Sequence, residues 1–259
     1  MVCRLSGPEN AFAIIERKAD YVKKVVAVIG GCGGLGIQLV KSHLMTGDIV
    51  YAYGLKVSSE MKELMEKKET LYFQECDVSE TGNVKTAMMA LKNDVKRVDI
   101  LYHTVGIYRF EDRAYLPDCD LDKMGRMFNV NAVGFLRILQ SLWDILKDTA
   151  IICITSEAGS IGSNFRSWEY EYCMSKCAEN MAAVIAQHYF TEIGNKSRIM
   201  CVHPGWLRTK MGGEEAFLHP EISINPGESA ESIRKIAENI NSFPPGVMYM
   251  DYAQNNLKW

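Results

Sequence analysis

The chain has 259 residues, of which 47% are hydrophobic and 24% are charged, and its formal net charge is -3. This size and composition favour a single globular α/β domain with a complete core. The small net charge argues against a nucleic-acid or anionic-membrane surface. No apolar run approaches the roughly 18 residues of a membrane span, and the first residues lack the apolar stretch of a signal peptide.

The eight cysteines are scattered without a C-x-x-C pair, and the five histidines show no H-x-x-x-H or H-E-x-x-H spacing. Cys173 and Cys177 share a helical face, but no nearby His or Cys pair completes a zinc set. We therefore expect reduced core cysteines and no metal site. Together with the missing signal segment, this pattern predicts a cytoplasmic protein.

Residues 1–22 precede the first strong strand and are interpreted as an N-terminal extension, while residues 23–259 are predicted to form one dinucleotide-binding catalytic domain. Within the N-terminal region, residues 11–24 have the apolar spacing of a short amphipathic helix. No chemistry is assigned to this segment. It is expected to cover the domain or to mediate an interface.

A glycine-rich loop follows the β-branched run at 24–29, which is typical of a buried parallel strand. Gly30, Gly34 and Gly36 are spaced as G-x-x-x-G-x-G and lead into an apolar-periodic helix that includes Leu35. Glycine at such a junction permits a tight turn and lets the backbone approach a pyrophosphate at the helix N-terminus. A flexible turn would not need three glycines at these spacings, so the loop favours a dinucleotide site.

The second strand, expected at 49–54, ends where dinucleotide-binding folds place an acidic residue for the ribose hydroxyls. Here the strand ends in Gly54, which is followed by Leu55 and Lys56. The missing carboxylate removes repulsion against a 2′-phosphate, and Lys56 can attract one. This slightly favours NADP over NAD, although Lys56 reads equally well as a solvated loop lysine.

Strands and helices alternate through the rest of the chain. Further strands are expected at 71–76, 99–106, 149–155, 198–203 and 246–252. Helices are expected at 58–69, 79–93, 118–146, 172–190 and 229–241, with Ser58 and Ser79 as N-caps of the first two. This order predicts a Rossmann-type, doubly wound α/β fold, with a seven-stranded parallel sheet and helices on both faces.

Tyr172 and Lys176 lie four residues apart on one helix and so share a face. A free phenol has a pKa near ~10, and a neighbouring ammonium lowers that pKa by favouring the phenolate. A phenol with a lowered pKa can exchange a proton with a substrate oxygen. The pair alone is unremarkable, because an exposed helix often carries Tyr and Lys at this spacing by chance.

Other candidate residues follow the strands, at the carboxyl edge where open α/β sheets bind ligands. Ser156 ends the fifth strand, and Asp77 ends the third, where it can meet an adenine amino group. Residues 204–209 follow the sixth strand. Asn131 lies within an apolar helical segment, where a polar side chain usually has a partner or a function.

Six ordered motifs make the chain resemble the short-chain dehydrogenase/reductase family over about residues 23–259. The motifs are GGCGGLG, CDVS, NVNAVG, TSEAGSIG, YCMSK and HPGWLRT, and the final segments are similar to its carbonyl-reductase/C-factor-like branch. The resemblance implies a catalytic tetrad of Asn131, Ser156, Tyr172 and Lys176. It also implies cofactor contacts from Gly30, Gly34, Leu35, Gly36, Lys56, Asp77, Val78, Thr104, Gly106, Tyr172, Lys176, Pro204, Gly205 and Thr209.

In this family pattern Tyr172 is the general acid and base, and Lys176 lowers its pKa and holds the nicotinamide ribose. Ser156 binds the substrate oxygen, Asn131 supports Lys176 through a water, and Thr209 binds the carboxamide. The implied activity is hydride transfer between NAD(P)(H) and a small carbonyl or secondary-alcohol substrate. A homodimer or homotetramer is a further implication.

The chain departs from the family pattern at two loops. Ile29 stands where threonine is usual, and residues 103–106 read His-Thr-Val-Gly instead of Asn-Asn-Ala-Gly. These changes remove polar side chains that brace the loops, and His103 is expected to stand in for asparagine by bonding across strands. They motivate an alternative function, a non-catalytic dinucleotide-binding or signalling protein. A sugar-nucleotide epimerase is a third reading, which the short C-terminal region disfavours.

Overall fold

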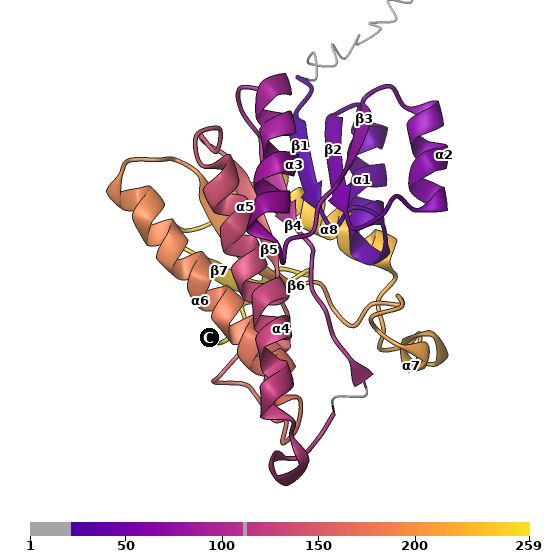
Figure 1. Cartoon of the computed structure of the whole chain (residues 1–259), viewed down its shortest axis with the longest axis vertical. Coiled ribbons are helices and arrows are strands. Elements are labelled where there is room, and N and C mark those ends of the chain that lie inside the picture. The colour runs from indigo at the N-terminus through magenta and orange to yellow at the C-terminus, as the bar shows by residue number, and fades with distance from the viewer. Residues whose placement is uncertain (1–21, 111–112) are drawn as a thin grey trace, which may run out of the picture.

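A single seven-stranded sheet organises the computed structural model, which describes residues 22–110 and 113–259. The strand order is β3-β2-β1-β4-β5-β6-β7, and every neighbouring pair is parallel (Figure 1). The predicted doubly wound fold is therefore confirmed. Most of the N-terminal helix expected at 11–24 lies outside the described residues.

The strands agree closely with the segments expected from β-branched and apolar runs. They are β1 Val25–Ile29, β2 Ile49–Gly54, β3 Leu71–Glu75, β4 Ile100–His103, β5 Ala150–Ile154, β6 Arg198–His203 and β7 Met248–Asp251. The expected extension of the fourth strand to residue 106 is wrong, because the chain leaves the sheet after His103 to form a loop.

Eight α-helices connect these strands within the described residues. They are α1 Gly34–Thr46, α2 Ser59–Lys67, α3 Thr81–Asp94, α4 Met124–Phe128, α5 Gly134–Leu142, α6 Tyr170–Glu192, α7 Glu214–Leu218 and α8 Pro226–Glu238. Among the residues the structure describes, none of these helices is both long and apolar enough to cross a bilayer.

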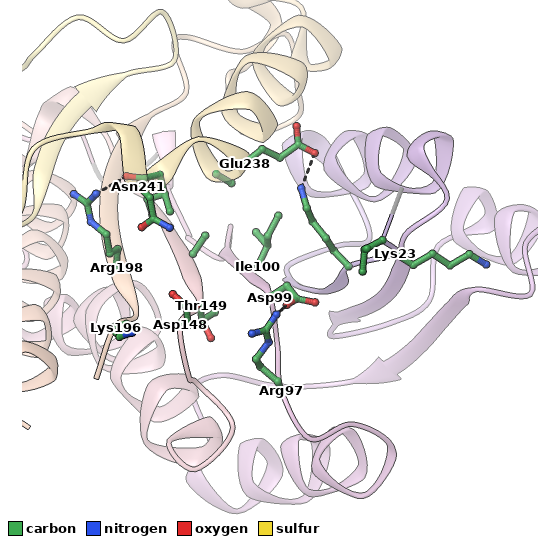
Figure 2. Close-up of a pocket in the computed structure, with 15 residues that line it drawn as sticks. Lys23, Arg97, Asp99, Ile100, Asp148, Thr149, Lys196, Arg198, Glu238 and Asn241 are labelled. Atoms are coloured by element: carbon green, nitrogen blue, oxygen red, sulfur yellow. Dashed lines mark hydrogen bonds and ion pairs between the residues drawn. The ribbon is translucent and has the colours of Figure 1, made fainter. Parts of the chain in front are cut away.

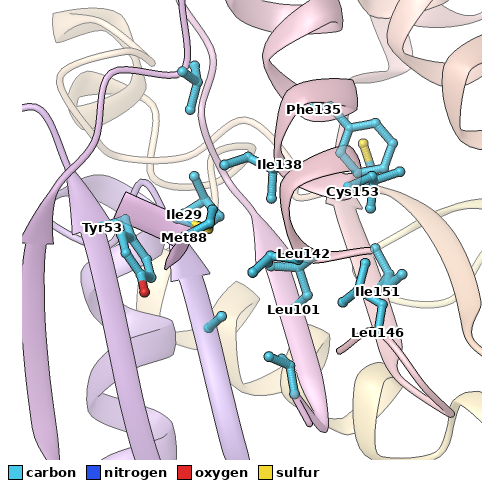
Figure 3. Close-up of a cluster of buried hydrophobic side chains, with 14 of the residues drawn as sticks. Ile29, Tyr53, Met88, Leu101, Phe135, Ile138, Leu142, Leu146, Ile151 and Cys153 are labelled. Atoms are coloured by element: carbon cyan, nitrogen blue, oxygen red, sulfur yellow. The ribbon is translucent and has the colours of Figure 1, made fainter. Parts of the chain in front are cut away.

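The core lies on both faces of the sheet because successive strand residues point to opposite sides. In β1, Ala27 and Ile29 pack with α3, α5 and α6, whereas Val26 and Val28 pack with α1, α2 and α8. Figure 3 shows the first of these layers, where Ile29, Leu101 and Ile151 meet side chains of α3 and α5. Because all strands run parallel, their carboxyl ends lie together at one edge of the sheet.

Two local expectations are wrong. The single helix expected at 118–146 is divided by a π-helical turn, Asn129–Val133, between α4 and α5. Ser79 does not cap α3; its hydroxyl and amide donate to the Asp77 carboxylate, and Glu80 is the N-cap residue. Ser58, by contrast, accepts a hydrogen bond from the Met61 amide and caps α2 as expected.

Candidate active site

The candidate site lies at the carboxyl edge of the sheet, where the strand order changes direction between β1 and β4. The turn after β1 requires glycine, because Gly30 and Gly34 have φ values of 93° and 52°. A Cβ on Gly36 would lie 2.1 Å from the carbonyl oxygen of Gly30. The turn and the start of α1 are therefore in direct backbone contact.

The amino end of α1 is open to an anionic group. Its N-cap, Gly33, offers no side-chain hydrogen bond, and the first turn has no acidic residue. A Cβ added to Gly33 would meet nothing within 4 Å. Helix amino ends attract anions through free backbone amides and the helix dipole, so these residues fit a dinucleotide pyrophosphate.

Thr104 supports the turn from the neighbouring strand. Its hydroxyl donates to the carbonyl oxygen of Ile29 at 2.9 Å, and a Cβ on Gly30 would lie 2.4 Å from this hydroxyl. The expectation that the sequence departures leave the loops without polar support is therefore wrong. His103 contacts α6 instead of bonding across strands, since its Nδ1 lies 3.2 Å from Glu179 Oε1.

Tyr172 stands near the start of α6 with Ser156, which follows β5. The Ser156 hydroxyl accepts from the amide of Ala158 at 3.2 Å, and Ser156 lowers the pKa of the nearby phenol. Burial raises the pKa of Tyr172, while Lys176 and Ser156 lower it and Glu179 raises it. The net pKa is raised. The expected effect of Lys176 is present, but the prediction of a lowered phenol pKa is wrong because desolvation outweighs it.

Lys176 is almost fully buried beneath Tyr172. Its ammonium donates to the carbonyl oxygen of Ile154 at 3.1 Å and to Glu179 Oε2 at 2.7 Å. A Cβ on Gly106 would lie 3.3 Å from Nζ, so the loop after β4 passes directly beside the ammonium. Burial opposes the charge on Lys176, yet the attraction of Glu179 and Tyr172 raises its pKa overall.

Asn131, fully buried in the π-helical turn, joins two parts of the site. Its Oδ1 accepts from the Ile107 amide at 2.7 Å, and its Nδ2 donates to the Ile107 carbonyl at 3.1 Å and to Ser175 Oγ at 3.0 Å. These bonds hold the loop after β4 against α6. Asn131 thus bonds to Ser175, the residue before Lys176, and its support of Lys176 through a water stays a prediction.

The remaining predicted cofactor residues fall into two groups. Thr209 lies across from the glycine turn, with its Cγ2 3.6 Å from the position of a Cβ on Gly34. Pro204 and Gly205 follow β6, and the Pro204 carbonyl accepts from Ser229 Oγ at 2.7 Å. The structure does not bring the other four predicted cofactor residues beside Tyr172. Leu35 is buried in α1, and Lys56 is exposed after β2. Asp77 is hydrogen-bonded to Ser79, and Val78 packs against Gly134.

Aromatic side chains lie over Tyr172. The Tyr108 ring packs edge-on against Tyr172 at a centroid distance of 4.9 Å, and its hydroxyl donates to Glu169 Oε1 at 2.5 Å. Phe110 touches the loop after β6, because a Cβ on Gly213 would lie 2.7 Å from its ring. Segments following β4 and β6 therefore meet over the site.

Sequence reasoning missed Glu179 and Tyr108. Glu179 was detectable, since a residue three positions after Lys176 shares its helical face. Tyr108 carried no signal, because its position over Tyr172 depends on the path of a loop. Both residues contact the predicted catalytic pair.

A cavity of about 300 Å³ lies at the opposite, amino-terminal edge of the sheet (Figure 2). Several of its charged side chains are already engaged, for example in the ion pairs of Lys24 with Glu238 and of Arg97 with Asp99. No residue of the predicted tetrad lines it. The cavity is therefore separate from the candidate active site.

The sheet order and the glycine turn together define a Rossmann-type dinucleotide-binding protein, and comparisons with known proteins identify its family. The model of the short chain dehydrogenase family matches residues 24–216. The chain therefore belongs to the short-chain dehydrogenase/reductase family, and it is an NAD(P)-dependent oxidoreductase of that family. The resemblance found in the sequence is confirmed.

The individual relatives are distant in sequence, and their alignments with this chain span most of each relative's length. The C-signal protein of Myxococcus xanthus is 28% identical over 166 residues, which are 62% of this chain and 93% of that protein. An uncharacterized oxidoreductase of Schizosaccharomyces pombe is 26% identical over 235 residues, covering 84% and 91%. The NADPH-bound carbonyl reductase from chicken fatty liver has a TM-score of 0.78 at 21% identity, covering 92% and 94%.

Proposed function

We propose that this oxidoreductase interconverts a small carbonyl compound and its secondary alcohol, with Tyr172 as general acid and base. The supporting observation is that Ser156, after β5, and Lys176, one turn along α6, both act on the Tyr172 phenol, with the Lys176 ammonium held by the Ile154 carbonyl and Glu179. A bound nicotinamide supplies hydride in reduction and accepts it in oxidation. Tyr172 donates its proton to the substrate oxygen in reduction and removes it in oxidation, while Ser156 donates a hydrogen bond to the same oxygen.

NADP(H) is proposed as the preferred cofactor. The chain has Gly54, not an acidic residue, at the end of β2, and the exposed Lys56 follows it. A 2′-phosphate would meet a cation there and no carboxylate from Gly54 to Lys56. The chicken carbonyl reductase of similar fold is NADPH-bound, which agrees with this preference.

The test is the Tyr172→Phe variant. It should bind NADPH with unchanged affinity, measured by quenching of nucleotide fluorescence, and should lose NADPH oxidation with a panel of aldehydes, ketones and quinones. Tyr189→Phe, an exposed tyrosine on the same helix, is the matched control and should retain activity. A fully active Tyr172→Phe enzyme would contradict the mechanism.

The non-catalytic alternative is not favoured by any contact among the described residues, because the departures that motivated it leave the loops braced by Thr104. For the substrate, the aromatic rim formed by Tyr108 and Phe110 supports an apolar or aromatic carbonyl compound. Trp206 is also exposed, and its indole donates to the Gly212 carbonyl beside the Gly213 segment that Phe110 contacts. The cytoplasmic location stays a prediction.

A homodimer or homotetramer formed through α5 and α6 is also proposed. Their outer faces expose large apolar side chains, including Leu136 at 43%, Met181 at 58% and Ile185 at 60%. Met181 and Ile185 lie one turn apart on the same face of α6, and an exposed apolar stripe of this kind is typical of an interface. The partner that fits it is a second copy of the same chain, because a twofold axis would place the patch against itself.

A further inference from the structure

A buried carboxylate lies behind the proposed catalytic lysine. Glu179 is fully buried and Lys176 is 4% exposed, and the two lie three residues apart on one face of α6. Burying a charge is costly unless it is paired and hydrogen-bonded. The placement of a glutamate here therefore requires compensating contacts, and the surrounding strands supply them.

Three elements converge on the Glu179 carboxylate. Oε2 accepts from Lys176 Nζ at 2.7 Å, and Oε1 accepts from the Cys153 thiol of β5 at 3.3 Å. His103 Nδ1 of β4 lies 3.2 Å from Oε1, a contact close enough for an ion pair but not aligned as a hydrogen bond. His103, Cys153 and Cys201 are in-register neighbours on β4, β5 and β6, so the sheet itself forms the wall behind Glu179.

Lys176 is thereby fixed from two sides. One N–H of the ammonium points to Glu179 and another to the Ile154 carbonyl at 3.1 Å. An ammonium has three N–H groups, so one remains for a further partner. The orientation of Lys176 is set by direct contacts with protein atoms.

We propose, resting on the function proposed above, that Glu179 is a positioning residue that fixes and neutralises Lys176, so that Tyr172 stays protonated and serves chiefly as the acid for carbonyl reduction. A lysine without a counter-ion would favour the phenolate and thus the base needed for alcohol oxidation. With the carboxylate beside it, the net charge next to Tyr172 is close to zero. The Tyr172 phenol then keeps its proton and can donate it to the substrate oxygen.

The pKa directions agree with this geometry. Burial opposes ionisation of Glu179, but Lys176 and His103 outweigh it and lower its pKa, so the carboxylate is charged. For Tyr172, burial, Glu179 and Glu157 raise the pKa, whereas Lys176 and Ser156 lower it. The Tyr108 ring covers Tyr172 from the β4 loop, and its hydroxyl bonds Glu169.

A metal ion is the competing explanation, because the potential ligand atoms of His103, Cys153 and Glu179 lie within 4.8 Å of one another. Two observations favour the hydrogen-bonded cluster. The Lys176 ammonium, at 2.7 Å from the carboxylate, would repel a cation. Burial also raises the pKa of Cys153 far above its usual value, which disfavours the thiolate that metals bind.

The test compares Glu179→Gln, which keeps the side-chain shape and removes the charge, with wild type. Without the carboxylate the buried Tyr172–Lys176 pair carries an extra positive charge, so it should lose its proton about one to three pH units lower. This titration is measured as tyrosinate absorbance, each protein minus its Tyr172→Phe counterpart. The alkaline decline of kcat/KM for carbonyl reduction should move in parallel. Glu238→Gln, which breaks an ion pair in α8, should leave both unchanged.

Glu179→Asp retains the charge at a greater distance and should give a smaller shift in the same direction, which keeps the test available if the Gln variant does not fold. An unshifted titration in a folded Glu179→Gln protein would overturn the proposal. Stoichiometric zinc in purified wild type that is lost in this variant would overturn it in favour of a metal site. Absence of turnover with a shifted titration would refute the proposed function and leave the role of Glu179 standing.

Discussion

The Thr104 hydroxyl is hydrogen-bonded to the carbonyl oxygen of Ile29, which ties the end of β4 to the end of β1 where the glycine turn begins. Both strand ends belong to the point at which the sheet order changes direction. The bond leaves almost no room at the turn, because side-chain atoms added to Gly30 or Gly36 would overlap neighbouring atoms. The geometry of the cofactor loop therefore depends on contacts between two strands.

Gly36 has no room for a side chain. Gly36→Ala places a Cβ 2.1 Å from a backbone oxygen that cannot move freely, and should cost about 3 kcal/mol of stability through overpacking. It should also abolish dinucleotide binding. Urea unfolding and nucleotide titration measure the two effects. Gly82→Ala is the control, since nothing lies within 4 Å of its Cβ in α3; it should stay within about 1 kcal/mol of wild type.

Replacing Asn131 should loosen the site as well as the fold. Asn131→Ala leaves the partly buried Ile107 amide without its acceptor and the buried Ser175 hydroxyl without its donor, which should cost about 2 kcal/mol. Because the loop beside Lys176 is then free to shift, kcat should fall with it. Asn239→Ala removes an exposed asparagine that bonds only one carbonyl of its own helix, and should cost no more than about 0.5 kcal/mol. Equal stability of the two variants would contradict the bridging role.

Cofactor choice should respond to the charge at Lys56. The Lys56→Glu variant replaces attraction for a 2′-phosphate with repulsion, so the Kd for NADPH should rise about tenfold or more, roughly 1.4 kcal/mol. The Kd for NADH should change little. Lys68→Glu, an exposed lysine at the end of α2, serves as the control. A uniform loss of affinity for both nucleotides would show that Lys56 does not select between them.

Stability should decline at alkaline pH because burial raises the pKa of Tyr53, Tyr102 and Tyr249 in the folded protein. The unfolded chain releases these protons near pH 10, so their contribution is complete below about pH 10 and falls above it by about 1.4 kcal/mol per pH unit for each group. Urea midpoints at about pH 8 and about pH 10.5 measure this decline. Tyr53→Phe should show a shallower decline than wild type; an identical slope would contradict the assignment.

A single charged substitution tests the proposed oligomer interface on α5 and α6. Ile185→Glu places a carboxylate in the apolar face of α6 and should convert an oligomer to a monomer, as measured by light scattering during size exclusion. Met89→Glu changes a residue of equal 60% exposure on α3 and should not alter the mass. A wild-type protein that is monomeric at all measured concentrations would contradict the proposed oligomer.

Local patterns were sufficient for most of the fold. Buried parallel strands are continuous apolar runs, so β2 and β6 begin and end where the sequence predicts. The prediction of one helix at 118–146 was wrong because the π-helical turn within it depends on tertiary contacts of its side chains. Asn131 occupies that turn and bonds the β4 loop and α6, neither of which is adjacent to it in the chain.

From the amino-acid order alone, the glycine turn and the pairing of Tyr172 with Lys176 on one face follow directly, since both depend on residues a few positions apart. Tertiary packing decided what this pair is chemically. Glu179 meets His103 and Cys153 only because β4, β5 and α6 pack together, and the phenol pKa rises because burial outweighs a nearby ammonium. Desolvation and buried charge depend on every atom around a group, and the spacing of residues along the chain does not contain that information.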